Sequence, residues 1–265
     1  MANVVTADSA SHHHSSTVNL KDWLQSAPYT IALSSCYFGF FAHVGVLSAL
    51  EDHHLLPEKL SGSSAGALAG TMWASGNSTS TLSSLLFTLT RNCFWDPAPG
   101  IGLLKGERFR NSIVEMAAAT TLEDCQVPVA VSAFDLLSLQ TQVFKSGNLA
   151  ECVYASCTVP LLFQPMRIAN KLCFDGGIRD WAGCAGVDAG DRVLRIALFN
   201  RNRYLLNVLP CAQAVNNEQT RTVVISNLTP VSPLSMHKGK VAFYQARQSM
   251  LIALNKTISE PILCA

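Results

Sequence analysis

The sequence predicts an α/β fold with a mainly parallel central sheet, and three observations lead to this prediction. Short apolar runs alternate along the chain with longer segments of helical spacing, which is typical of parallel strands joined by crossover helices. Of the 265 residues, 49% are hydrophobic and 14% are charged, so we expect a large buried core and not a disordered chain. No internal repeat or linker interrupts the pattern. We therefore expect one domain over residues 28–265, after a partly disordered leader over residues 1–27.

The first part of this domain predicts two strand-to-helix connections. Residues 28–33, PYTIAL, form a short apolar run that predicts a buried strand. Residues 40–52 predict a helix, because their apolar side chains recur at helical spacing. We expect a turn at residues 58–62 and then a helix that begins at Ser64, whose small residues allow close packing on a sheet. Gly76 is the expected end of this helix.

The rest of the chain continues the alternation of strands and helices. Runs rich in β-branched residues predict strands at 127–134, 141–144, 171–174, 193–199 and 222–225. Segments of helical spacing predict helices at 79–91, 107–118, 149–156 and 237–254, with a loop rich in proline and glycine between the first two. Because the helices alternate with the strands throughout, we expect helices on both faces of the sheet.

Charge and cysteine content exclude several classes of function. Nineteen Lys and Arg residues against 18 Asp and Glu residues give a net charge of +1, so the chain has no general basic field for a nucleic acid. The nine cysteines include no C-x-x-C pair, and an odd number of thiols fits a reduced, cytoplasmic protein better than a disulfide framework. No metal-ligand spacing or phosphate-binding loop is present outside a histidine-rich leader, so we expect no metal and no cofactor.

A candidate nucleophile lies at the start of the second predicted helix. Residues 62–66, GSSAG, match the pattern G-x-S-x-G with Ser64 at the centre. This chemistry needs a serine on a sharp strand-to-helix turn, where Gly62 and Gly66 would relieve crowding of the strained backbone. Unpaired N–H groups at the start of the helix favour developing negative charge. The motif alone is weak, but its place between an apolar segment and a small-residue helix supports Ser64 as a nucleophile.

A candidate general base follows the strand predicted at residues 171–174. Asp175 stands at the end of this strand, where its side chain can reach the same sheet edge as Ser64. Gly176 and Gly177 would let the backbone bend tightly and bring the carboxylate close to the serine hydroxyl. An aspartate is a weak base because its ordinary pKa is about 3.9, and burial would make it stronger.

Taken together, these motifs resemble those of the patatin-like phospholipases, which are lipid acyl hydrolases with a Ser–Asp dyad. Four segments carry the resemblance in the family's order: HVGVL at 43–47, GSSAG at 62–66, ASCTVP at 155–160 and FDGG at 174–177. The resemblance implies a three-layer α/β/α sandwich, with Ser64 as nucleophile and Asp175 as general base. It also implies a phospholipid or glycerolipid substrate and transient contact with a membrane or lipid-droplet surface.

One segment departs from the family's pattern. The family usually has a G-G-G-x-x-G loop after its first strand, whereas this chain has SSCYFGF with a single glycine. Backbone N–H donors need no glycine, although conformations with positive φ favour it. We expect the oxyanion hole to use N–H groups of Cys36, Tyr37, Phe38, Gly39 and Ala65. The altered loop predicts either low activity or a differently built oxyanion hole.

Four aromatic residues lie in or directly after this loop, namely Tyr37, Phe38, Phe40 and Phe41. They are interpreted either as core packing around the first helix or as an apolar wall for an acyl chain. Core packing is the preferred interpretation, because Phe and Tyr are ordinary core residues.

Three alternatives stay open. A Ser–His–Asp triad would need His237, which follows both candidate acids, Asp135 and Asp175, although its lysine-rich surroundings are typical of a solvated helix end. His43 is interpreted as structural. The same fold could also bind lipid without catalysis, or transfer an acyl group to an acceptor other than water. The sequence carries no indication of an oligomeric state.

Overall fold

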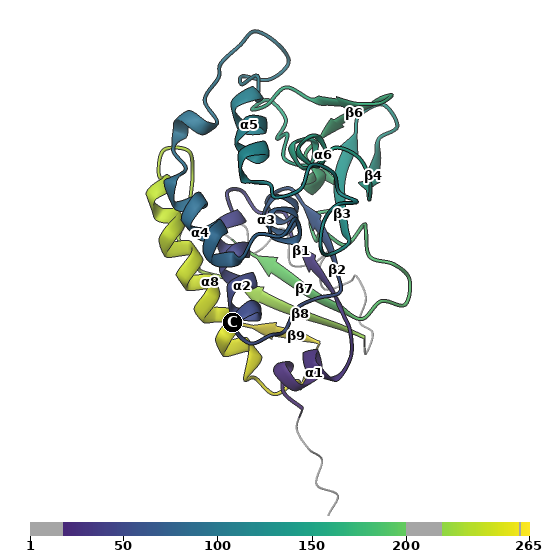
Figure 1. The fold of residues 1–265 in the computed structure, drawn as a ribbon, viewed down its shortest axis with the longest axis vertical. Helices are drawn as coiled ribbons and strands as arrows, with labels where there is room; N and C mark the ends of the chain where they lie inside the picture. Colours follow the sequence, from purple (N-terminus) through teal and green to yellow (C-terminus); the bar gives the residue numbers. More distant parts are fainter. Residues whose placement is uncertain (1–17, 200–218, 260) are drawn as a thin grey trace, which may run out of the picture.

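The computed structural model describes residues 18–199, 219–259 and 261–265, and these residues form a mixed α/β fold (Figure 1). The α-helices are α1 (Leu20–Ser26), α2 (Phe40–Asp52), α3 (Ala65–Ala74), α4 (Thr79–Thr88), α5 (Glu107–Met116), α6 (Leu149–Ser156) and α8 (Gly239–Leu254). The short 3-10 helices are η1 (Arg91–Cys93), η2 (Gly176–Ile178) and η3 (Met236–Lys238). The strands are β1 (Thr30–Leu33), β2 (Lys59–Ser63), β3 (Val129–Asp135), β4 (Gln140–Phe144), β5 (Met166–Ile168), β6 (Lys171–Phe174), β7 (Val193–Leu198), β8 (Thr220–Ile225) and β9 (Ile262–Cys264).

The strands of the described residues form one nine-stranded sheet. Its order is β5-β6-β3-β2-β1-β7-β8-β9, and β4 pairs with β3 outside this path. Strands β3, β2, β1, β7, β8 and β9 pair in parallel, whereas β4, β5 and β6 join the sheet antiparallel. The predicted α/β class with a mainly parallel central sheet is therefore confirmed.

The two faces of the sheet differ in chemistry. Because side chains alternate along a strand, the residues that share a face with Leu60 point toward helix α3, where an added Cβ on Gly70 would lie 2.7 Å from the Leu60 side chain. The opposite face of β2 presents Ser61, whose hydroxyl accepts a hydrogen bond from the Gly186 N–H at 3.1 Å. The helical face thus carries large aliphatic residues, and the other face carries small and polar ones.

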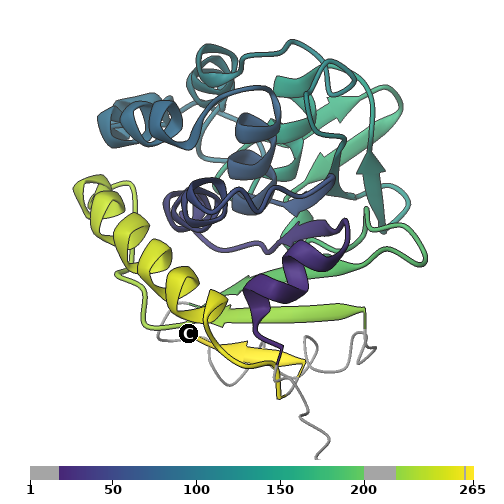
Figure 2. The same ribbon diagram turned by 60° about the horizontal axis from the view of Figure 1, so that its bottom comes forward.

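Among the described residues, the two faces of the sheet are also covered differently. In Figure 2, α8 (yellow) and α2 to α4 (dark blue) lie together on one side of the sheet. Over β1 to β3, the opposite face is covered by an irregular segment at residues 183–192 in place of a helix. A helix would need a broad aliphatic surface to bury its apolar stripe, and small residues such as Ser61 and Ala130 do not provide one.

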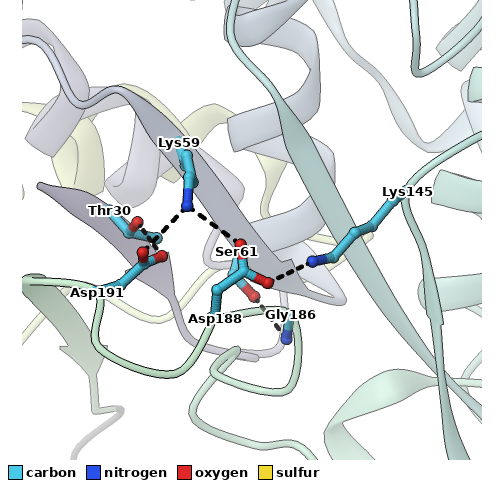
Figure 3. A network of polar contacts seen from close by, with 7 residues as sticks. All are labelled: Thr30, Lys59, Ser61, Lys145, Gly186, Asp188 and Asp191. Atoms are coloured by element: carbon cyan, nitrogen blue, oxygen red, sulfur yellow. Dashed lines mark hydrogen bonds and ion pairs between the residues drawn. The ribbon is translucent and has the colours of Figure 1, made fainter.

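A polar network fixes this segment to the edge of the sheet opposite Ser64 (Figure 3). Lys59, at the start of β2, pairs with Asp191 at 3.0 Å and with Asp188 at 3.1 Å. The Thr30 hydroxyl donates to Asp191 at 2.7 Å, and Lys145 pairs with Asp188 at 2.7 Å. The chain that leaves Asp175 is therefore anchored at the far edge of the sheet before it enters β7.

Several elements differ from the sequence predictions. The turn predicted at residues 58–62 is wrong, because Lys59–Ser63 form strand β2. Its glycine and serines resemble turn chemistry. In the fold, Gly62 lies against Ala67 of α3 and Ser61 lies beneath Gly186 on the other face, and both close contacts need small residues. Elements α1, β5 and β9 lie outside the predicted set. Helix α1 falls inside the predicted leader, where the Asn19 side chain accepts the Asp22 N–H as an N-cap at 2.8 Å.

Two stretches of the sequence, residues 29–50 and 60–90, contain no Asp, Glu, Lys or Arg, and both form strand-to-helix units in this sheet. In the described ranges, no helix combines the length and the apolar character needed to span a bilayer.

Candidate active site

The site lies where two strands meet end to end against a third. Strand β2 runs parallel to β3 as far as Ser132, β6 pairs antiparallel with β3 from Phe134, and β4 occupies the other edge of β3. The last residues of β2 and β6 therefore converge opposite Ala133. Ser64 directly follows β2, and Asp175 directly follows β6, so the topology alone brings the two side chains together.

The two predicted catalytic side chains are in hydrogen-bond contact. The Ser64 hydroxyl donates to Oδ2 of Asp175 at 2.6 Å, and the side chains are 9% and 6% exposed. Burial raises the pKa of Asp175 to about 6, against the lowering effect of hydrogen bonds from the Ser64 hydroxyl and the Gly177 N–H. This carboxylate is consequently a stronger base than an exposed aspartate and still ionised at neutral pH.

The backbone of Ser64 has the strain expected of a nucleophile turn. Its φ is 50° and its ψ is −119°, a region that non-glycine residues rarely occupy. The Ser64 N–H donates to the hydroxyl of Ser156 at 2.8 Å, and this hydroxyl donates to the Ser132 carbonyl at 2.6 Å. The Cys157 thiol donates to the Ser64 carbonyl at 3.2 Å. These contacts hold the strained turn from both sides.

Sequence reasoning assigned no role to Ser156 or Ser132. The only signal for Ser156 was the segment ASCTVP, which carried part of the family resemblance. Ser132 lies inside an apolar strand and shows nothing distinctive in the sequence, because it contacts Ser156 through its backbone carbonyl and not through its side chain.

The motif glycines permit close approach of backbone segments. A Cβ added at Gly66 would collide with the Leu33 carbonyl, and a Cβ at Gly176 would collide with the Ser132 carbonyl. Gly62 and Gly177 are similarly crowded. The Gly177 N–H also donates to Oδ1 of Asp175 at 2.8 Å, which orients the carboxylate toward Ser64.

A cavity of about 270 Å³ opens beside the dyad and is largely apolar. Phenylalanines from distant segments form much of its wall: Phe38, Phe40, Phe94, Phe109 and Phe163. Their rings form a continuous cluster, with centroids 5.6 Å apart for Phe38 and Phe94 and 4.9 Å apart for Phe94 and Phe109. Phe94 and Phe109 come from segments with no motif, and Phe163 follows the ASCTVP segment of the family resemblance, but the sequence analysis assigned none of the three to a cavity wall.

The four aromatic residues of the first loop divide between the two interpretations. Tyr37, Phe38 and Phe40 line the cavity, and Tyr37 is also 49% exposed. Phe41 is 1% exposed and belongs to the core, in contact distance of helix α8 at Gly239. The preferred interpretation as core packing is therefore right for Phe41, whereas the other three form a wall of the cavity.

The expected oxyanion donors are only partly brought together. Cys36, Tyr37, Phe38 and Ala65 line the cavity beside Ser64, but Gly39 does not. The Gly39 N–H donates to the Cys36 carbonyl at 2.8 Å, so it is engaged within its own turn. This contact removes Gly39 from the expected donors.

The positive φ that favours glycine in this loop occurs at Phe38, whose φ is 53°. The loop therefore holds a left-handed conformation at a non-glycine residue, which is an energetically costly arrangement.

Neither His43 nor His237 extends the dyad. His43 is fully buried, and its Nε2 lies 2.8 Å from the Ser34 carbonyl, which assigns a proton to Nε2. Burial lowers the pKa of His43 to about 4, so it is neutral and fixes the start of the 34–39 loop. His237 is exposed in η3 and does not line the cavity. Asp135 accepts the Ser138 hydroxyl at 2.7 Å and stabilises the β3–β4 turn.

In the described part of the chain, no group of three or more His, Cys, Asp or Glu side chains is placed to hold a metal ion. The histidine-rich leader lies outside the described residues.

Comparison with known proteins identifies the family. A family model described as patatin-like phospholipase matches residues 31–183, which is more than half of the chain. The chain belongs to this family. The match includes both Ser64 and Asp175, as well as the loop that departs from the family's glycine-rich pattern.

Two curated relatives and one solved structure are similar to this chain. An uncharacterized NTE family protein of Mycobacterium bovis is 29% identical over 175 residues, covering 63% of this chain and 48% of the relative. The Lysophospholipase NTE1 of Cryptococcus neoformans is 24% identical over 146 residues, covering 52% of this chain and 9% of the relative. The crystal structure of VipD from Legionella pneumophila has a TM-score of 0.65 and 14% identity, covering 87% of this chain and 67% of VipD.

The likeness to VipD shows the fold, and the family model shows the family. The chain spans about half the length of the mycobacterial relative. Membership of the patatin-like phospholipase family supports a lipid hydrolase in general.

Proposed function

We propose that this chain is a serine-dependent lipid acyl hydrolase, which releases fatty acids from phospholipids or glycerolipids through Ser64 and Asp175. The observation that carries the proposal is the 2.6 Å hydrogen bond from the Ser64 hydroxyl to a buried carboxylate at the mouth of an apolar cavity. A carboxylate in direct contact can accept the hydroxyl proton without an intervening histidine.

In the first half-reaction, the Ser64 oxygen attacks the ester carbonyl carbon while Asp175 takes the hydroxyl proton. The carbonyl π pair moves to oxygen and forms a tetrahedral intermediate. When this intermediate collapses, the bond to the alcohol oxygen breaks, and the alcohol leaves with the proton from Asp175. The products are an acyl group on Ser64 and a free alcohol, such as a lysolipid or glycerol derivative.

In the second half-reaction, Asp175 takes a proton from a water molecule that attacks the acyl-enzyme. The bond to the Ser64 oxygen then breaks, and this oxygen recovers the proton from Asp175. The fatty acid leaves, and the dyad returns to its starting state. The same carboxylate therefore acts as base and as acid in each half-reaction.

Stabilisation of the oxyanion is assigned to backbone N–H groups around the cavity. Ala65 begins helix α3, so its N–H is one of the helical donors without an intrahelical acceptor and lies at the positive end of the helix dipole. The N–H groups of Cys36, Tyr37 and Phe38 supply the other side of the proposed hole. Because these donors belong to the backbone, the loss of loop glycines leaves them present.

The cavity and the cysteines bear on the substrate and the compartment. A volume of about 270 Å³ lies near the lower limit of ligand sites, which run from roughly 300 Å³, and suits a single acyl chain. One relative is named a lysophospholipase, so single-chain phospholipids are the first substrates to assay. No disulfide joins any two of the eight cysteines of the described residues, which fits the proposed cytoplasmic location.

The deciding experiment compares ester hydrolysis by four proteins: wild type, Ser64→Ala, Asp175→Asn and Ser63→Ala. The panel contains lysophospholipid, phospholipid, neutral glyceride and a short soluble ester. We expect Ser64→Ala and Asp175→Asn to lose at least about a thousandfold in kcat/KM, because each removes a group that forms the acyl-enzyme. Ser63→Ala is the matched control, since its buried hydroxyl has no hydrogen-bond partner among the described residues.

Labelling with a fluorophosphonate separates the alternatives. Labelling that requires Ser64 supports the acyl-enzyme, whereas its absence in a folded chain supports a lipid-binding module.

Replacing His237 by Ala tests the triad, and we expect unchanged turnover because this side chain is exposed and does not line the cavity. Acyl esters of an added alcohol, formed in place of free fatty acid, would assign the chain as an acyltransferase. Equal hydrolysis by all four proteins contradicts the proposal.

A further inference from the structure

Exposed aliphatic side chains gather around the mouth of the cavity. Six of them form what we call the apolar rim: Ile101, Leu103, Leu136, Leu137, Leu139 and Leu161. Their exposed fractions run from 40% for Leu136 to 80% for Leu161, so these side chains contribute little to the core. Soluble monomers rarely expose a contiguous apolar patch unless it makes an interaction.

One half of the rim borders the cavity through the segment that follows α6. The Leu103 N–H donates to the Leu161 carbonyl at 3.0 Å, which joins the loop after η1 to this segment. The residues on either side of Leu161, Pro160 and Leu162, line the cavity. Leu161 therefore projects outward from a strip of chain whose neighbouring residues face the substrate.

The other half borders the cavity through the segment that follows Asp175. The Arg179 guanidinium donates to the Leu139 carbonyl at 2.5 Å, which ties the β3–β4 turn to this segment. The preceding residue, Ile178, lines the cavity and is itself 46% exposed. In Figure 1, strands β4 and β6 and helix α5 lie in the upper part of the molecule.

The charges around the rim have one sign. The segments that carry it, residues 97–105, 136–144 and 159–179, contain Lys105, Arg167, Lys171 and Arg179, and their single acid is the buried Asp175. Lys105 pairs with Glu107 at 2.8 Å. The other three cations form no salt bridge within the described residues. This excess is local, because the whole chain has a net charge of only +1.

We propose that the apolar rim and these three cations, Arg167, Lys171 and Arg179, form a docking face for an anionic phospholipid bilayer. The aliphatic side chains enter the boundary between headgroups and acyl chains, and the cations meet the lipid phosphates. This docking places the cavity mouth against the lipid surface. The inference rests on the proposed function, because it names the surface from which the hydrolase takes its substrate.

The charge distribution favours a bilayer over a second copy of this chain. A symmetric dimer through this face would bring the same three cations of each copy toward one another, with no exposed carboxylate in these segments to separate them. An anionic lipid surface offers the opposite sign over its whole area.

The test measures vesicle binding by a variant that lacks the proposed nucleophile. Ser64→Ala protein is sedimented with vesicles of phosphatidylcholine mixed with phosphatidylserine, so that hydrolysis does not alter the lipid. Adding Ile101→Gln and Leu137→Gln, at sites 69% and 63% exposed, should weaken binding about tenfold or more. Adding Leu56→Gln and Ile252→Gln, at sites 54% and 48% exposed away from the rim, should leave it unchanged.

A second pair of variants tests the charges. Lys171→Gln should weaken binding to the mixed vesicles several-fold and should have little effect with phosphatidylcholine alone. Lys21→Gln removes an equally charged, partly exposed side chain from α1 and should have no effect. Added salt should reduce the difference between the two variants, because it screens exposed charges.

Each outcome has a defined meaning. Equal vesicle binding by the rim variant and its control overturns the docking face, as does absence of binding by the parent. A rim variant that changes the oligomeric state but not vesicle binding also overturns it, and assigns the face to a second copy. In a chain with Ser64 intact, the rim changes should leave hydrolysis of a short soluble ester unchanged. Failure of the wild type to hydrolyse any ester, with vesicle binding intact, contradicts the proposed hydrolase but supports the docking face.

Discussion

Asp175 combines two properties that a dyad base needs. It is buried, which raises its pKa to about 6, and it receives two hydrogen bonds, which keep the ionised form accessible. An exposed aspartate with a pKa near 3.9 would be a far weaker base. A buried aspartate without these hydrogen bonds would stay protonated at neutral pH and could not accept the Ser64 proton.

The first prediction concerns the pH dependence of catalysis. Because Asp175 must be ionised to act as base, kcat/KM should rise with pH, with a midpoint near 6, and level off above neutrality. The measurement is a pH–rate profile on a short soluble ester, which avoids pH effects on lipid surfaces. A rise in kcat/KM centred near pH 4 would show that the pKa of the Asp175 carboxyl is not raised. A rise that is absent in Asp175→Asn but unchanged in Ser63→Ala would support the assignment to Asp175.

The second prediction concerns stability at the same residue. The pKa of Asp175 is higher in the folded chain, about 6, than the value of about 3.9 expected when unfolded, so the folded state binds more protons between these values. Stability should therefore fall as pH rises from about 4 to about 6 and stay reduced above, by up to about 3 kcal/mol. Asp175→Asn should then be more stable than wild type at neutral pH and comparable near pH 4, as measured by urea unfolding.

A surface carboxylate, Asp188, provides the control for the direction of this stability change. Lys145 and Lys59 hold the pKa of Asp188 below its usual value, so its charge favours folding. Asp188→Asn should lower stability at neutral pH, in the opposite direction to Asp175→Asn. A stability gain in both variants would show that the effect at Asp175 is not due to burial of its charge.

Among the elements, the contact between α2 and α8 is unusually close. A Cβ added at Gly45 would collide with the Phe243 carbonyl on α8. Gly45→Ala should therefore force these helices apart and destabilise the fold by about 1–3 kcal/mol, although alanine ordinarily favours a helix. Thermal unfolding measures the change, with the exposed Gln248→Ala on α8 as control. A gain in stability at Gly45 would contradict the close packing described here.

The elements also show where sequence patterns succeed. Helix α6 and strand β6 match their predicted bounds, because a clear N-cap at Asn148 and the Asp-Gly-Gly turn mark their ends. Strand β2 was mistaken for a turn because Lys59–Ser63 combines glycine and serine, which local preference assigns to turns. Tertiary packing beneath α3 overrides that preference. Short edge elements such as β5 and β9 carry too few residues for a periodic signal.

For the site, a local motif was enough to find residues whose neighbours must be glycine, namely Ser64 and Asp175. It was not enough for residues that act through position alone. Phe94, Phe109 and Phe163 reach the cavity from separate parts of the chain, so only the folded structure reveals them. Gly39 shows the opposite case, a residue that the motif predicted as an oxyanion donor but whose N–H is engaged in a turn with the Cys36 carbonyl.

At the scale of the whole molecule, the site depends on segments distant in sequence. Ser64 and Asp175 are 111 positions apart, and the serine that supports the nucleophile turn, Ser156, is 92 positions from it. These contacts cross the sheet between β2, β3 and β6, so in denaturant we expect the site to be lost together with the sheet.

The corresponding prediction uses denaturant. Fluorophosphonate labelling of Ser64 and the far-UV circular dichroism signal should be lost with the same midpoint in urea, as expected if residues 28–265 form one cooperative domain. Labelling that disappears at clearly lower urea would show that the site opens before the rest of the sheet. Two separate dichroism transitions would contradict the single domain.

The end-to-end meeting of β2 and β6 has one more consequence. Strand β6 is held to β3 by only two Cα pairs, Phe134 with Phe174 and Asp135 with Cys173, whereas β2 is held by four. The β5–β6 hairpin, which carries Asp175, is thus held to the sheet less firmly than β2, which carries Ser64. Brief local opening of this hairpin in water would separate the base from the nucleophile without global unfolding. Hydrogen–deuterium exchange of the β6 amides should therefore report what fraction of the molecules is assembled for catalysis at any moment.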